Sequence, residues 1–172
     1  MSSTTQPIAL APLTVADMPA VRRLAHAIWH EAYPAIIGRD QIDFMLAARC
    51  TDAVLGGSIG ASDRWFDVLR VAGEPVGYCS SARLAEDGEL KLEQLYLLAA
   101  HRGRGLGRLM LEHVERRGRD AGLRGVVLQV NKRNAPAIAF YRAAGFTVRA
   151  EAVFDIGGGY VMDDFIMAKP LG

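Results

Sequence analysis

The stretch that decides the fold is ELKLEQLYLLAAHRGRGLGR, residues 89–108. Residues 89–98 are apolar overall and alternate only in part, a pattern that suits a central strand buried on both faces. Three glycines follow, Gly103, Gly105 and Gly107, and apolar residues then recur at helical spacing. The sequence therefore predicts a strand, a glycine-rich loop and a helix in immediate succession.

The loop is suited to binding an anion. Glycine reaches backbone angles that other residues avoid and lets a ligand approach the main chain, so that successive amides can form an anion nest. Arg102, Arg104 and Arg108 add three permanent cations, which suit a pyrophosphate better than a neutral sugar or peptide. The alternative is a tight glycine turn beside a solvated arginine face, and this segment alone leaves both readings open.

Spacing excludes two other phosphate-binding loops. A P-loop closes on Lys followed by Ser or Thr, whereas Arg108 is followed here by Leu109. A dinucleotide-binding loop needs a third small residue, but the two candidate glycine pairs run on to the bulky Arg108 and Met110. Nicotinamide nucleotide binding is therefore not expected.

A second motif lies downstream of the loop. It reads Asn134-x-x-Ala137-x-x-Phe140-Tyr141-x-x-x-Gly145-Phe146. Together with strand residues 92–97 and the loop Arg102-x-x-Gly105-x-Gly107, it resembles the Gcn5-related N-acetyltransferase (GNAT) family, in which both signatures occur in this order. The resemblance covers roughly residues 76–150, and the amino-terminal part agrees with the family only in the type and order of its elements.

The resemblance implies a mixed, strongly twisted sheet whose fourth and fifth strands splay apart, with the pantetheine arm of acetyl-CoA between them. Backbone groups near Leu95 and Leu97 would then pair with pantetheine, and Asn134 would touch the same arm. The phosphates would lie on the loop, cradled by Arg102, Gly103, Arg104, Gly105, Leu106, Gly107 and Arg108.

Acetyl transfer to an amine needs a group that removes a proton. An alkyl amine has a pKa of about 10.4, so only about one molecule in two thousand carries a free lone pair at neutral pH. Glu93 lies on the strand beside the expected thioester, and polyamine acetyltransferases of the family have Glu at the matching position. We expect Glu93 to act as general base through water. The alternative is a surface carboxylate without a role.

The departing thiolate needs a proton in return. A phenol with a pKa of about 10 stays protonated at neutral pH and can supply it. The resemblance assigns this role to Tyr141. The alternative is a core aromatic residue packed beside Phe140, although only one of two adjacent helix residues can point fully inward.

Periodicity and turn residues predict the rest of an α/β fold. Further strands are expected over residues 8–13, 65–71, 76–84, 126–130, 146–154 and 161–167. Helices are expected from about Met18 up to Pro34, over 39–49, after Gly105 up to about Gly122, and over 134–144. The prediction is one domain over residues 1–172, with a mixed sheet of six or seven strands flanked by about four helices.

Composition places the chain among ordered globular proteins, with 51% hydrophobic and 23% charged residues. The 20 Lys and Arg nearly balance the 19 Asp and Glu, which argues against nucleic acid or an anionic membrane as partner. Without a signal peptide or an apolar run of about eighteen residues, a cytoplasmic location is expected. Cys50, Cys79 and the four His show no metal-binding spacing, so neither a metal nor a disulfide is expected.

These features predict an N-acetyltransferase that moves acetyl from acetyl-CoA to a primary amine of a small molecule. Residues 163–169 are similar to the end of bacterial polyamine N-acetyltransferases, which favours a polyamine or another small cationic amine. A protein amino terminus or lysine is the alternative acceptor, and a non-catalytic acyl-CoA-binding or sensing module is the alternative function. The acyl chain length and the oligomeric state, a homodimer included, stay open.

Overall fold

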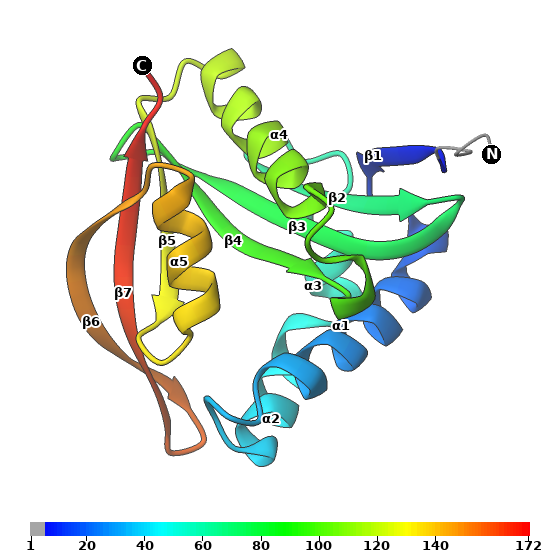
Figure 1. The fold of residues 1–172 in the computed structure, drawn as a ribbon, viewed down its shortest axis with the longest axis horizontal. Coiled ribbons are helices and arrows are strands. Elements are labelled where there is room, and N and C mark those ends of the chain that lie inside the picture. The colour runs from blue at the N-terminus through cyan, green and yellow to red at the C-terminus, as the bar shows by residue number, and fades with distance from the viewer. Residues whose placement is uncertain (1–5) are drawn as a thin grey trace.

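The computed structural model describes residues 6–172, which form one seven-stranded mixed sheet with helices on both faces (Figure 1). The strand order is β1-β2-β3-β4-β5-β7-β6. The strands are β1 Ile8–Pro12, β2 Arg64–Val71, β3 Glu74–Leu84, β4 Glu89–Leu97, β5 Gly125–Asn131, β6 Thr147–Gly157 and β7 Tyr160–Pro170.

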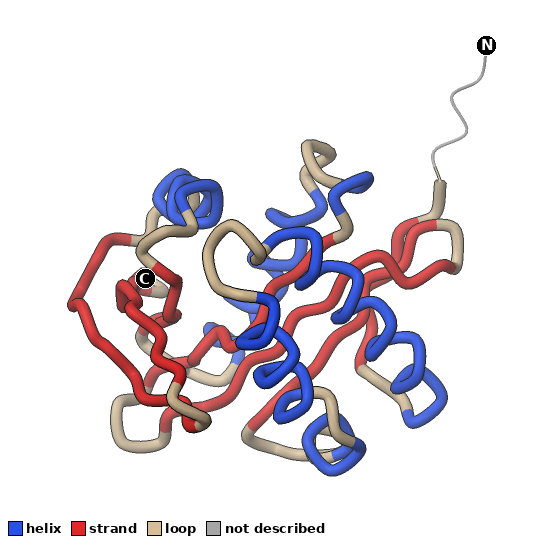
Figure 2. Tube along the Cα trace, turned by 90° about the horizontal axis from the view of Figure 1, so that it is seen from below, coloured by secondary structure: helices blue, strands red, loops and turns tan. Residues whose placement is uncertain are grey.

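The pairing of β4 with β5 sets the shape of the sheet. It is the parallel pair, and it runs only from Glu89 opposite Gly125 to Leu92 opposite Leu128. Both strands continue beyond these residues without pairing with each other, so they diverge. Figure 2 shows the consequence, with the hairpin of β6 and β7 set apart from the strands on the other side of β4.

The helices divide between the two faces of the sheet. They are α1 Met18–Ala32, α2 Arg39–Arg49, α3 Asp52–Gly56, α4 Leu106–Asp120 and α5 Ala135–Ala143. One core cluster joins buried residues of α4 to β4, β5 and β7, and α5 packs against it. The other joins α1, α2 and α3 to β2 and β3. Figure 1 shows α4 and α5 on the near side of the sheet.

The sequence prediction of a mixed α/β fold is confirmed, with seven strands and with α2 at the expected bounds. One short helix, α3, was not among the expected elements. This helix has only five residues, too few to show helical periodicity, and it starts where the Thr51 side chain accepts a hydrogen bond from the Val54 amide at 3.2 Å. No helix within residues 6–172 has the length and apolar character needed to cross a bilayer.

A buried ion pair fixes α4 on the sheet. Asp67 of β2 is 1% exposed and accepts two hydrogen bonds from Arg117 of α4, at 2.6 and 3.2 Å. His113, one turn earlier on α4, lies 3.4 Å from the same carboxylate. Burial by itself raises the pKa of Asp67, but hydrogen bonds from His113 and Arg117 outweigh burial, and the pKa lies below its usual value. The pair therefore holds the helix that begins at the glycine-rich loop.

We predict that Asp67→Asn lowers the free energy of unfolding by about 3 kcal/mol at pH 7, because it leaves the Arg117 guanidinium without its counter-ion. The Asp67 pKa is lowered on folding, so its contribution is present above the unfolded value of about 4 and is lost as pH falls through the folded value. Urea unfolding at pH 7 and pH 3 measures both effects. Asp63→Asn, at an exposed carboxylate, is the control; equal losses in the two variants would contradict a stabilising role for the pair.

Candidate active site

The residue at which β4 leaves β5 is a β-bulge. Ser80 of β3 lies opposite Gln94, and Ser81 lies opposite Leu92, so Glu93 is an extra residue on β4. Leu92 is also the last residue of β4 that pairs with β5. The bulge and the end of pairing therefore coincide at the position that the sequence singled out as general base.

Beyond the bulge, β4 presents an unpaired backbone edge. The Leu98 amide donates to Val76 of β3 at 2.9 Å. Because successive residues of a strand point their backbone groups to opposite edges, Leu97 and Leu95 turn theirs toward β5, which has already diverged. Arg102 Nε reaches the Leu97 carbonyl from this side at 3.3 Å. This geometry leaves the backbone of Leu95 and Leu97 facing the gap.

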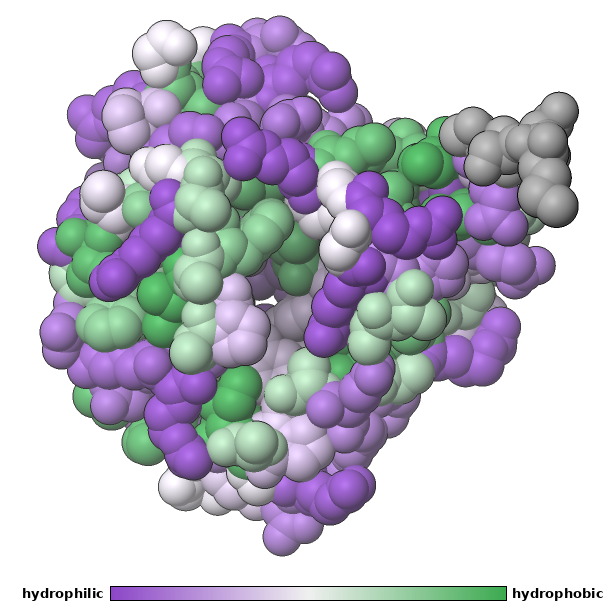
Figure 3. All heavy atoms as spheres, in the orientation of Figure 1, coloured by the Kyte–Doolittle hydropathy of each residue, from purple (hydrophilic) through white to green (hydrophobic). Residues whose placement is uncertain are grey.

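A hollow lies in this region of the surface. Figure 3 shows it near the middle of the face, between the half of the molecule that carries α5 and the half that carries α1 and α2. The splayed strands therefore enclose a space that side chains do not fill.

The glycine-rich loop takes the conformation that the sequence predicted. Gly103 and Gly105 have positive φ angles of 72° and 77°, and Gly105 is the residue before α4. A Cβ added at either glycine would meet nothing within 4 Å, so the loop faces open space. Gly107 differs, because its own Cβ would contact the Phe140 ring at 3.5 Å, which makes it a packing position between α4 and α5. Leu106 is buried and anchors the start of the helix.

The three arginines of the loop are exposed. Arg104 Nη1 lies 3.4 Å from His101, and Arg108 pairs with Glu112 at 3.1 Å. Within the described part of the chain, no carboxylate pairs with Arg102 or Arg104. Two guanidinium groups without a carboxylate partner and the amino terminus of α4 thus surround the same loop, an arrangement that favours a bound phosphate.

Asn134 is the residue before α5. Its side-chain oxygen accepts a hydrogen bond from the Ala137 amide at 3.3 Å, which explains why the helix begins there. The cap uses the carbonyl oxygen and leaves the side-chain NH2 free to donate. The helix ends before Gly145, whose φ angle is 96°.

Tyr141 lies on α5 and is half-buried, with its ring edge-on to Phe140 and Phe146 at centroid distances of 5.2 and 5.6 Å. Burial raises the pKa of its phenol, and the neighbouring Tyr33 and Cys79 add to the rise. No hydrogen bond from residues 6–172 reaches its hydroxyl. Tyr141 therefore combines a packed ring with a protonated hydroxyl that has no protein partner.

Glu93 is exposed at the bulge. It acts on Arg64 of β2, whose pKa is raised chiefly by Asp63 and to a smaller extent by Glu93. The structure thus gathers the β4 edge, the loop and the start of α5 around one gap, and it places Glu93 at the point where that gap begins.

An aromatic cluster that sequence reasoning missed lies on the other side of β4. The cluster consists of Trp29 of α1, Tyr33 directly after α1, and Tyr78 and Tyr96 of the sheet, with ring centroids 5.0 to 6.2 Å apart. The hydroxyls of Tyr33 and Tyr96 are 3.1 Å apart. Tyr96 sits inside the strand that decides the fold, and this position was the one signal that could have marked the cluster.

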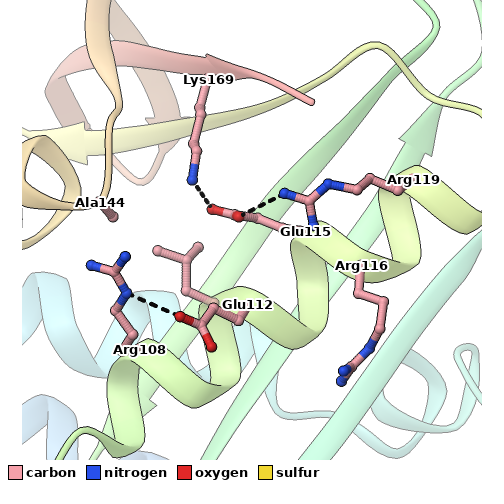
Figure 4. Close-up of a pocket in the computed structure, with 8 residues that line it drawn as sticks. Arg108, Glu112, Glu115, Arg116, Arg119, Ala144 and Lys169 are labelled. Carbon is pink, nitrogen blue, oxygen red and sulfur yellow. Dashed lines mark hydrogen bonds and ion pairs between the residues drawn. The ribbon is translucent and has the colours of Figure 1, made fainter. Parts of the chain in front are cut away.

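A pocket of about 380 Å³ lies beside α4 and not in the gap between β4 and β5 (Figure 4). Buried Glu115 at its wall pairs with Lys169 of β7 at 2.7 Å and with Arg119 at 3.4 Å. Both cations are therefore paired with the carboxylate of Glu115, which links α4 to β7. The candidate reaction centre is the gap between β4 and β5, and not this pocket.

The cysteines and histidines were the weaker candidates in the sequence. Burial raises the pKa of both cysteine thiols, Cys50 and Cys79, so neither is an activated nucleophile. His26 and His30 stack at 6.1 Å, and His30 pairs with Asp43 at 2.9 Å. Residues 6–172 contain no group of three His, Cys, Asp or Glu that could hold a metal ion.

The sheet is mixed and opens between its two parallel strands, beside a glycine-rich loop that leads into a helix, and this is the fold of acyl-CoA N-acyltransferases. The family model described as the acetyltransferase (GNAT) family matches residues 19–146. The chain belongs to this family and is an N-acetyltransferase.

Named relatives agree with this assignment. An uncharacterized N-acetyltransferase from the pepI 3′ region of Lactobacillus delbrueckii subsp. lactis is 29% identical over 155 residues, which cover 84% of this chain and 89% of the relative. Streptothricin acetyltransferase of Streptomyces lavendulae is 33% identical over 86 residues, or 50% of this chain and 46% of the relative. The fold matches PaiA N-acetyltransferase of Thermoplasma acidophilum, solved with coenzyme A, at a TM-score of 0.82 and 23% identity, covering 95% and 99% of the two chains.

We predict that Gly105→Glu weakens acetyl-CoA binding at least about 100-fold, because a carboxylate in the loop repels phosphate and covers the backbone amides. Gly122→Glu is the matched control, since Gly122 also has a positive φ, 69°, with nothing within 4 Å of its Cβ position. Both variants carry the same backbone strain, of about 1–2 kcal/mol. Calorimetry with acetyl-CoA separates them, and equal affinity in the two variants would show that the loop is only a turn.

Proposed function

We propose that this protein transfers the acetyl group of acetyl-CoA directly to the primary amine of a small cationic molecule. The observation that carries the proposal is the gap between β4 and β5, bordered by the free backbone edge of β4 and by the glycine-rich loop. An extended amide-bearing arm can pair with that edge as a missing strand would, while its phosphates lie on the loop.

The binding roles follow from the groups that lack partners. Leu95 and Leu97 pair with the pantetheine amides, and the free NH2 of Asn134 donates to the same arm. Arg102, Gly103, Arg104, Gly105, Leu106, Gly107 and Arg108 cradle the pyrophosphate. This assignment is supported by the open space at Gly103 and Gly105 and by Arg102 and Arg104, which pair with no carboxylate within residues 6–172.

Two side chains move protons in the proposed reaction. Glu93, through a water molecule, takes the proton that the ammonium group must lose before its nitrogen attacks the thioester carbonyl. The carbon–sulfur bond then breaks, and Tyr141 gives its proton to the leaving thiolate. The second proton that the nitrogen loses as it becomes an amide returns through water to Tyr141. The exposure of Glu93 suits a water-mediated role, and the raised pKa of Tyr141 keeps its proton available at neutral pH.

We predict that Tyr141→Phe lowers turnover by about 10²- to 10⁴-fold, the usual size of a general acid contribution, and changes acetyl-CoA affinity by less than about tenfold. The ring and its packing against Phe146 remain, so the melting temperature should hold. Tyr160→Phe, on the β6–β7 hairpin against Phe44, is the control. Turnover, affinity and melting temperature are measured on one preparation; near-normal turnover in Tyr141→Phe would remove this residue from the mechanism.

We predict that Glu93→Gln lowers turnover most near neutral pH, with partial recovery as pH approaches the pKa of the amine. At high pH the acceptor is already deprotonated, so the base is no longer needed. Glu86→Gln, at an exposed carboxylate between β3 and β4, should leave the pH profile unchanged. Initial rates of all three proteins, measured from pH 6 to 10, test this prediction. A Glu93→Gln profile parallel to that of the wild type would exclude the role.

An acceptor screen tests the function as a whole. Free coenzyme A is measured after incubation with acetyl-CoA and each of four amines: spermidine, tyramine, streptothricin and an alanyl peptide. We expect release with at least one of the small cations and not with the peptide. Release with the peptide alone would favour a protein acetyltransferase. Binding of acetyl-CoA with no release from any amine would favour the sensing module.

A further inference from the structure

Asp164 of β7 lies at the open end of the gap. It pairs in register with Asn131, the last residue of β5, three positions beyond the point where β4 and β5 part. Phe165, next along the strand, packs with the α4 core cluster, whereas Met162 packs with the α1 cluster. Because side chains alternate along a strand, Asp164 faces the α1 side of the sheet, opposite the side of the phosphate loop.

The Asp164 carboxylate is buried and has no partner. The residue is 5% exposed, and its Oδ1 atom is inaccessible to solvent. No hydrogen bond or ion pair from elsewhere in residues 6–172 reaches it. Asp163 provides the contrast, since it is exposed and pairs with Lys132 at 2.7 Å. Buried carboxylates are normally paired, so an unpaired one at the mouth of a reaction gap requires an explanation.

Charged groups of α2, β4, β7 and the turn after β5 act on Asp164 without pairing with it. Burial raises its pKa to about 6, and Asp163 on the same strand adds to the rise. Arg49 of α2, Lys132 after β5 and Lys91 of β4 lower it, yet none lies within ion-pair distance of it. At neutral pH the group is therefore mostly ionised and still lacks a counter-ion.

Asp164 also lies near the residues that border the reaction centre. Burial raises the pKa of Tyr33, and the Asp164 carboxylate adds to that rise. Tyr33 in turn contacts Tyr96, one residue after Leu95 on the free edge of β4, and it contributes to the raised pKa of Tyr141. Aromatic faces and one buried carboxylate are the surroundings that bind an organic ammonium group.

We propose that Asp164 is the carboxylate that binds the ammonium group of the acceptor, entering from the α1 side. The inference rests on the proposed function and deepens it, because it names the charge that the acceptor must carry and the residue that recognises this charge. Asp164 selects and positions the acceptor, and proton removal stays with the base. Binding gives Asp164 the counter-ion that the folded protein does not supply.

The kinetic test compares Asp164→Asn with Asp163→Asn, using whichever of spermidine, tyramine and streptothricin is acetylated fastest. A charge-assisted hydrogen bond is lost in Asp164→Asn, so KM for the amine should rise about 10- to 100-fold, while KM for acetyl-CoA changes less than about threefold. Asp163→Asn should change neither by more than about twofold. An unchanged amine KM in Asp164→Asn would overturn the proposal.

The pH dependence provides a signature that a structural role would not give. In the wild type and in Glu93→Gln, kcat/KM for the amine should fall as pH drops through about 6, because protonated Asp164 no longer attracts the cation. This fall in kcat/KM below about pH 6 should be absent in Asp164→Asn. The Asp164→Asn variant should also melt at the same or a higher temperature at pH 8, because burial penalises the ionised form of Asp164. A lower melting temperature, together with a kcat/KM that still falls below about pH 6, would show that Asp164 has a structural role.

Calorimetry separates failure of this proposal from failure of the proposed function. The same three amines are titrated into protein saturated with coenzyme A, which needs no turnover. If the amine binds at least about tenfold more weakly to Asp164→Asn and the wild type acetylates none of the amines, the ammonium site is supported and the proposed transferase activity is rejected. Acetylation by the wild type with equal amine affinity in both forms would reject the ammonium site and keep the transferase.

Discussion

The site depends on the parting of β4 and β5 after only four paired residues. Pairing over Glu89–Leu92 holds the two halves of the sheet together, and the bulge at Glu93 comes where that pairing stops. Beyond it, Leu95 and Leu97 carry backbone groups without a strand to receive them, and unmet backbone groups are costly when buried. Two separate cores keep the strands apart, one under α4 and one under α1. The gap is therefore built into the packing and is not a loop that opens.

Charge is divided between the two sides of this gap. The arginines of the loop and the amino terminus of α4 lie on one side, and the unpaired carboxylate of Asp164 faces the other. A polyanionic donor and a cationic acceptor can then approach from different directions without competing for one field. The formal net charge of +1 conceals this separation, because the balance holds over the whole chain and not at the site.

The elements themselves were largely predictable, because each depends on local pattern. Helical spacing ended by glycine gave α4 and α5, and apolar runs between turn residues gave the strands. The contacts that were not predicted join residues far apart in the chain. Tyr33 and Tyr96 are 63 positions apart, and Arg117 and Asp67 are 50 apart, so no periodicity could join them. Asp163 and Asp164 are adjacent acidic residues that the sequence alone does not distinguish. In the structure Asp164 is buried and Asp163 is exposed. The roles of Glu93 and Tyr141 came from family resemblance and remain predictions.

Residue-resolved amide hydrogen exchange, with and without acetyl-CoA, tests the central claim most directly. Leu98 donates to Val76 in the free protein, so its amide should exchange slowly in both states. The amides of Leu95 and Leu97 face the gap, so they should exchange quickly in the free protein and at least about tenfold more slowly once acetyl-CoA binds. Acetyl-CoA binding that leaves exchange at Leu95 and Leu97 unchanged, while slowing other amides, would show that the cofactor does not lie between β4 and β5.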